Sequence, residues 1–93
     1  MPELSPARRR ELKARAHALD PVVLIGGGGL SAAVIAEIDR CLKSHELIKV
    51  RVNAQRAERD AAFREICRQT GAQAVQHIGK ILVLFRENPE HGR

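Results

Sequence analysis

Four consecutive glycines, Gly26 to Gly29, are the stretch of this 93-residue chain best suited to hold a ligand. They follow the apolar run of residues 21–25 and precede Leu30 and Ser31. Glycine loses more conformational entropy on folding than any other residue and offers no side chain for packing, so a run of four indicates that something approaches the backbone closely. With a strand before it and a helix after it, the loop leads into a helix N-terminus. Unpaired N–H groups and the helix dipole favour an anion there, and phosphate is the obvious candidate.

The better-known glycine motifs do not fit this loop. A P-loop requires Lys and then Ser or Thr after its last glycine, whereas Leu30 follows Gly29. A dinucleotide-binding fingerprint requires glycine at the position of Ser31 and an acidic residue about 20 positions later, where the basic Lys49 stands. The pattern that fits is G-x-x-G, formed by Gly26 and Gly29, which is the spacing by which KH modules clamp an RNA backbone.

The charge of the chain favours a polyanionic partner. Sixteen Lys and Arg against eleven Asp and Glu leave a formal net charge of +5. Phe63 and Phe85 are the only aromatic residues, so a base-stacking platform is not expected and contact with nucleic acid should be to its backbone. The basic residues placed at the candidate surface from their spacing are Arg8, Arg9, Lys13 and Arg15 on the first helix, and Lys49 and Arg51 on one face of a strand.

Hydrophobic spacing and turn residues predict an α/β fold with seven elements. The final strand is apolar on both faces, which is typical of a central strand or one covered on both sides. Gly79 predicts a tight antiparallel connection before it. We therefore expect a single domain over residues 1–87, in the order α-β-α-β-α-β-β with a mixed four-stranded sheet and three helices, followed by a polar and frayed tail over residues 88–93. The predicted helices cover residues 6–18, 31–44 and 56–70, and the predicted strands cover a short buried run at 21–25, then 47–52, 74–78 and 80–86.

No set of residues indicates catalysis or a bound metal. The four histidines are scattered, the Ser residues have no adjacent base in any known motif, and Cys41 and Cys67 lack metal-ligand spacing. We expect neither enzyme activity nor a cofactor. No apolar run reaches the roughly 20 residues of a membrane helix, and no signal peptide is recognisable, so we expect a cytoplasmic protein without membrane contact.

Taken in order, a series of short segments resembles the CRM domain, named for chloroplast RNA splicing and ribosome maturation. The likeness covers about residues 4–86 and is greatest to the stand-alone bacterial form, the YhbY type. The segments that carry it are the first helix, residues 21–26, Gly29-Leu30-Ser31, Glu37-Ile38, residues 45–50, Thr70-Gly71-Ala72, residues 78–80 and residues 82–86.

The resemblance implies RNA binding through the G-x-x-G loop and basic surface, in a fold similar to the C-terminal domain of translation initiation factor three. Bacterial members are associated with precursors of the large ribosomal subunit, and plant members with group II intron splicing. Gly26 and Gly29 match the motif. Family members commonly have a polar or basic residue where this chain has Gly27 and Gly28, so the loop is left with its backbone N–H groups and the helix dipole. Basic positions of the family are matched by Lys49, Lys80 and Arg86.

Together with the glycine loop and the basic charge, the resemblance implies a monomeric ribosome assembly factor that clamps the backbone of large-subunit precursor rRNA. Two alternatives stay open at this point. The glycine loop fits a protein that binds a small phosphorylated ligand. The basic first helix fits an adaptor whose Arg8, Arg9 and Lys13 contact an acidic protein.

Overall fold

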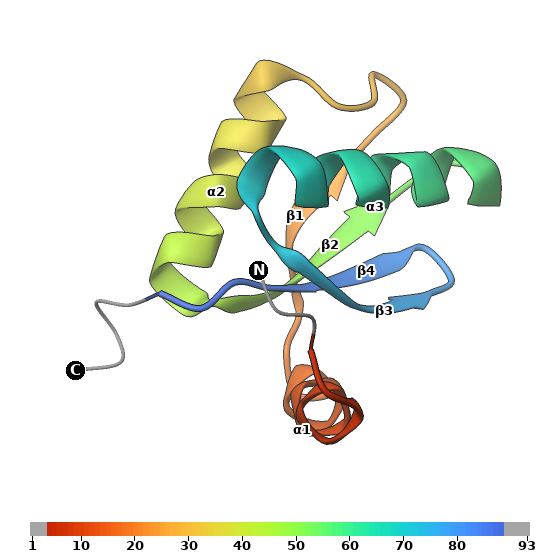
Figure 1. Ribbon diagram of the computed structural model, residues 1–93. Helices are drawn as coiled ribbons and strands as arrows, with labels where there is room; N and C mark the ends of the chain where they lie inside the picture. Colours follow the sequence, from red (N-terminus) through yellow and green to blue (C-terminus); the bar gives the residue numbers. More distant parts are fainter. Residues whose placement is uncertain (1–3, 89–93) are drawn as a thin grey trace.

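The computed structural model describes residues 4–88, and its element order confirms the predicted α-β-α-β-α-β-β fold (Figure 1). The third helix has the predicted bounds, whereas the first ends at Ala16, two residues early. Of the expected polar tail, residues 89–93 lie outside the described part. The elements are α1 (Pro6–Ala16), β1 (Pro21–Ile25), α2 (Ala32–His45), β2 (Leu47–Val52), α3 (Arg56–Thr70), β3 (Gln73–Ile78) and β4 (Ile81–Phe85).

The four strands form one mixed sheet in the order β1-β2-β4-β3. β1 and β2 are parallel, while β4 is antiparallel to both of its neighbours. Gly79, with a φ of 54°, occupies the first position of the two-residue turn between β3 and β4, as a hairpin turn of this length requires. Because β1 and β2 are parallel, the segments that follow them leave the sheet at the same edge.

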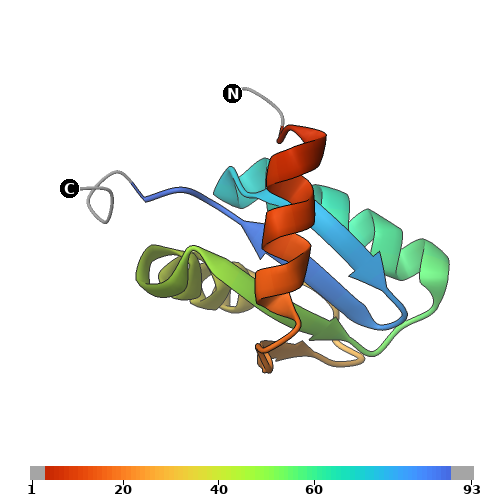
Figure 2. The same ribbon diagram turned by 90° about the horizontal axis from the view of Figure 1, so that it is seen from below.

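Helices cover both faces of the sheet, as the two-sided apolar pattern of β4 predicts. α2 and α3 lie on one face and α1 crosses the other (Figures 1 and 2). The larger core lies under α2 and α3 and contains Leu82 and Leu84 of β4. The smaller core lies under α1, where Leu12 and Ala16 pack on Val83 and Phe85.

The prediction that residues 21–25 form a buried strand is wrong for one of its two faces. β1 is the edge strand, and Val22 and Leu24 are 45% and 61% exposed, whereas Val23 and Ile25 are buried. The reason is the position of α1, which packs on β2, β3 and β4 and leaves the outer face of β1 open. Among the described helices none is long and apolar enough to cross a membrane.

Candidate functional site

The glycine loop joins β1 to α2 and stands clear of the rest of the protein. The N–H of Gly29 donates to the carbonyl oxygen of Gly26 at 3.1 Å and closes a tight turn. Only Gly29 has a positive φ, 70°, so only this position requires glycine for its backbone conformation. A Cβ at any of the four glycines would have no atom within 4 Å. The other three glycines therefore keep the surface of the loop bare, which is what close approach of a ligand to the backbone requires.

The first turn of α2 continues the loop with free N–H groups. Ser31 is the N-cap, and its hydroxyl oxygen accepts from the N–H of Val34 at 3.2 Å. The N–H groups of Ala32 and Ala33, in the same first turn, have no partner within the helix, because the first turn lacks preceding carbonyls. Leu30 is half-buried and packs against the larger core, so it anchors the loop. The capped N-terminus of α2 thus places the positive end of the helix dipole next to loop backbone that no side chain covers.

The loop forms one wall of a groove with a volume of about 940 Å³. The opposite wall is the stretch of α3 from Glu58 to Glu65, and the segment between β2 and α3 closes the end. Asn53 belongs to this segment, and its N–H donates to the carbonyl oxygen of Ile25 at 2.9 Å, which ties the two walls together. The groove is lined by Ile25, Gly26, Gly27, Gly29, Leu30, Val52, Asn53, Ala54, Gln55, Glu58, Arg59, Ala61, Ala62, Glu65 and Lys80.

Two of the predicted basic residues lie at this end of the sheet. Lys80 is exposed in the β3–β4 turn and lines the groove, and its carbonyl oxygen accepts from the N–H of Val52 at 2.8 Å. Arg51 is exposed on β2, and its Nε donates to Oδ1 of Asn53 at 3.3 Å. Lys49 lies two residues earlier on the same strand and is half-buried.

The basic residues of α1 lie across the sheet from α2 and α3 (Figure 2). Arg9 is half-buried and donates to the carbonyl oxygens of Ala74 and Val75, which fastens α1 to β3. Arg8 pairs with Glu11, and its guanidinium carbon lies 5.1 Å from the ring centroid of Phe85. Both guanidinium groups thus serve the packing of α1 on the sheet. The remaining two, Lys13 and Arg15, are half-buried and exposed respectively.

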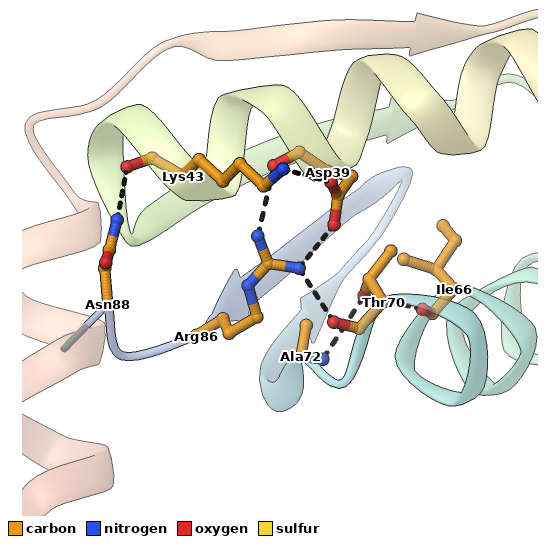
Figure 3. A network of polar contacts seen from close by, with 7 residues as sticks. All are labelled: Asp39, Lys43, Ile66, Thr70, Ala72, Arg86 and Asn88. Carbon is orange, nitrogen blue, oxygen red and sulfur yellow. Dashed lines mark hydrogen bonds and ion pairs between the residues drawn. The ribbon is translucent and has the colours of Figure 1, made fainter. Parts of the chain in front are cut away.

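Arg86 lies just past β4, at the end of the sheet far from the glycine loop, and joins α2 to α3 (Figure 3). One of its amino groups donates to Oδ1 of Asp39 at 2.6 Å and to the carbonyl oxygen of Thr70 at 2.8 Å. The other donates to the carbonyl oxygen of Asp39 at 3.2 Å. Next to it, the side chain of Asn88 donates to the carbonyl oxygen of Lys43 at 2.8 Å. These contacts hold the ends of two helices and a strand together.

The hydrogen bond from Arg86 lowers the pKa of Asp39 below its ordinary value of 3.8, against the opposing effect of burial. A carboxyl whose pKa is depressed in the folded state adds stability above its unfolded pKa and loses that contribution as the pH falls through the folded value. We therefore expect the stability difference between the wild type and Arg86→Ala to be constant above about pH 5 and to shrink below pH 3.8. Urea unfolding at a series of pH values measures this difference, and a gap that stays constant down to pH 2 would contradict the assignment.

The residues of the α3 wall and of the segment before it are the part of the site that the sequence did not predict. Asn53, Gln55, Glu58 and Arg59 all line the groove, yet they carry no recognisable motif. A signal for them did exist, because they follow β2, and parallel neighbours such as β1 and β2 end at the same edge of a sheet. In residues 4–88 no group of three or more His, Cys, Asp or Glu side chains could hold a metal ion.

Comparison with known proteins gives consistent matches over nearly the whole chain. The family model described as the CRS1 / YhbY (CRM) domain matches residues 4–86. A protein of Haemophilus influenzae named "RNA-binding protein" is 47% identical over 91 residues, covering 97% of this chain and 92% of the relative. A protein of Pseudomonas aeruginosa named "Probable RNA-binding protein PA4753" is 39% identical over 88 residues, covering 94% of this chain and 85% of the relative. The solution structure of a hypothetical protein from Staphylococcus aureus superposes with a TM-score of 0.81 at 34% identity, covering 91% of this chain and 90% of that one.

Proposed function

This chain belongs to the CRS1 / YhbY (CRM) domain family, and on that premise we propose that it binds RNA through the glycine loop and the groove beside it. The observation that carries the proposal is the bare, exposed turn of Gly26 to Gly29 directly before a capped helix N-terminus. Relatives that cover most of the chain are named as RNA-binding proteins, which supports the same conclusion.

In the proposed complex, an RNA phosphate lies against the loop backbone. The missing side chains at Gly27 and Gly28 allow the phosphate oxygens to reach the N–H groups of the loop and of the first turn of α2. Lys80 and Arg51 lie at the same end of the sheet and add positive charge, with Lys49 farther along β2. This contact reads the backbone and positions the RNA without reading its sequence.

The other predicted basic residues take different roles in this proposal. Arg8, Arg9 and Arg86 have their guanidinium groups engaged in packing and hydrogen bonds, so we assign them to the stability of the fold. Lys13 and Arg15 add positive charge on two sides of α1, which long-range attraction of RNA would use.

The biological role that fits this chain is ribosome assembly. We propose that it acts as a monomer on precursor rRNA of the large subunit in the cytoplasm, by binding alone and without a cofactor. This part rests on the family resemblance together with the basic charge of +5. Crosslinking in cells followed by sequencing of the bound RNA tests it, since a different class of bound RNA would contradict it.

Binding to a structured rRNA fragment should weaken as salt rises, because each neutralised phosphate releases counterions. We expect Lys80→Ala to weaken binding at low salt and to reduce the slope of log K against log salt by about 1. The matched control is Lys43→Ala, which removes the same charge in the last turn of α2, at the far end of that helix from the loop. Fluorescence anisotropy over a salt series gives both slopes. A wild-type slope of zero for log K against log salt would contradict RNA binding through phosphates. Equal slopes for the two variants would show that Lys80 does not contact RNA phosphate.

The two alternatives can be separated from this proposal. The volume of the groove is within the range of about 300–1,000 Å³ of small-ligand pockets, so a thermal-shift screen with nucleotides and sugar phosphates is informative. A ligand at a hundred times its dissociation constant would stabilise the protein by about 2.7 kcal/mol. The adaptor alternative relies on Arg8, Arg9 and Lys13, but the guanidinium groups of Arg8 and Arg9 contact the sheet instead. Protein partners that survive RNase treatment would support it.

A further inference from the structure

The two walls of the groove offer different groups to a ligand. The loop wall offers backbone N–H groups, and Lys80 lines the groove as well. The α3 wall offers the carboxylates of Glu58 and Glu65. Hydrogen bonds from Arg68 and Gln69 lower the pKa of Glu65 to about 2, so this carboxyl is ionised at neutral pH. A phosphate is therefore attracted to the loop wall, whereas on the α3 wall Glu65 is paired with Arg68 and only the Glu58 carboxylate, unpaired within residues 4–88, repels it.

Between these walls the lining is mostly apolar. Ile25 and Val52 come from the ends of β1 and β2, Leu30 comes from the loop, and Ala61 and Ala62 come from α3. Apolar side chains suit the flat faces of nucleobases and give nothing to a charged phosphate. An RNA strand whose backbone follows the loop would thus direct its bases toward α3. A duplex would place a second row of phosphates near the carboxylate of Glu58, so unpaired RNA fits better.

Most polar groups on the α3 wall are already engaged. Arg59 donates from Nε to Nε2 of His77 at 3.3 Å and from an amino group to the carbonyl oxygen of Ala54 at 2.7 Å. Glu65 accepts from Arg68 at 2.5 Å and 3.0 Å. Glu58 differs, because within residues 4–88 the structure gives its carboxylate no hydrogen bond or ion pair, although the side chain lines the groove. It is the carboxylate on this wall that is left available to a ligand.

Building on the proposed function, we propose that this groove holds unpaired RNA with its bases toward α3, and that Glu58 favours guanine. An ionised carboxylate has two acceptor oxygens and no donor, and it suits a partner with two parallel N–H groups. The Watson–Crick edge of guanine presents its N1–H and 2-amino group side by side. Adenine and cytosine each place one amino group next to an acceptor nitrogen, and uracil places one N–H between two carbonyl oxygens. Guanine is thus the one base that gives this carboxylate two bonds.

The test uses fluorescein-labelled, U-rich single strands that carry one central guanine, inosine or adenine, and a duplex of the guanine strand with its complement. Inosine keeps the N1–H of guanine and lacks only the 2-amino group. By anisotropy we expect the guanine strand to bind about fivefold or more tightly than the inosine and adenine strands, and more tightly than the duplex. Glu58→Gln should abolish the preference for guanine. Glu37→Gln makes the same change on the exposed face of α2, outside the groove, and should keep it.

The outcomes separate this inference from the function on which it rests. The role of Glu58 is overturned if the guanine, inosine and adenine strands bind equally. It is also overturned if Glu58→Gln leaves the guanine preference intact. In both cases the proposed RNA binding is unaffected. Binding of the duplex as tight as that of the single strand overturns the orientation of the bases. A protein that binds none of these probes and no structured rRNA overturns the proposed function together with the inference.

Discussion

Replacing Gly27 and Gly28 together by Asp is expected to weaken RNA binding about a hundredfold while the protein stays folded. Two carboxylates would stand where the phosphate approaches the loop, and like charges brought together in an interface cost several kcal/mol. Neither glycine has a positive φ, and a Cβ at either position meets no atom within 4 Å, so the fold should tolerate both side chains. Anisotropy with a structured rRNA fragment measures the affinity, and thermal unfolding verifies the fold.

The matched control replaces the same two glycines by Asn. Asn has the size of Asp without its charge, so the control separates repulsion from simple blocking of the backbone. We expect the Asn variant to bind more weakly than the wild type and clearly more tightly than the Asp variant. If the folded Asp variant binds as the wild type does, the glycine loop does not contact phosphate. Gly29 is left unchanged in both variants because its φ of 70° strains any other residue.

The layered fold was predictable because its local signals agree with its tertiary arrangement. The apolar run of residues 81–85 indicates a strand covered on both faces, and β4 is indeed a central strand between α1 on one side and the α2 and α3 layer on the other. The exposure of Leu24 was not predictable in the same way. An apolar strand next to a helix is normally read as buried, and only the position of α1 across β2, β4 and β3 leaves the outer face of β1 open.

The candidate site was predictable only where consecutive residues in the sequence mark it by their type. Four glycines and the cap residue Ser31 mark the loop, and the structure places them as a turn before a helix. The opposite wall was not predictable, since Glu58 looks like any solvated residue of a helix until the fold brings it to the loop. Charge was the least informative signal. Arg9 and Arg86 contribute to the same net charge as Lys80, but their hydrogen bonds inside the protein depend on residues far away in the sequence.

Replacing Arg86 by Ala is expected to destabilise the protein by about 2 kcal/mol or more, although the family resemblance predicts a contact between this residue and RNA. The side chain of Arg86 is 18% exposed, and its loss removes the donor to the Thr70 carbonyl and to both the carboxylate and the carbonyl of Asp39. The Asp39 carboxylate, 37% exposed, keeps Lys43 at 3.5 Å, so most of the cost comes from partly buried acceptors that lose their hydrogen-bond donor. In a domain of this size the melting temperature should fall by about 10 °C.

The matched control for this prediction is Arg68→Ala. Arg68 also pairs with a carboxylate, that of Glu65, but its side chain is 70% exposed, so its removal should change stability by less than about 0.5 kcal/mol. RNA binding by Arg86→Ala, measured well below its melting temperature, should keep the salt dependence of the wild type, because a guanidinium that holds α2 to α3 neutralises no phosphate. A variant that melts with the wild type but loses salt-dependent affinity would show the reverse, that Arg86 contacts RNA and that its hydrogen bonds to Asp39 and Thr70 are dispensable.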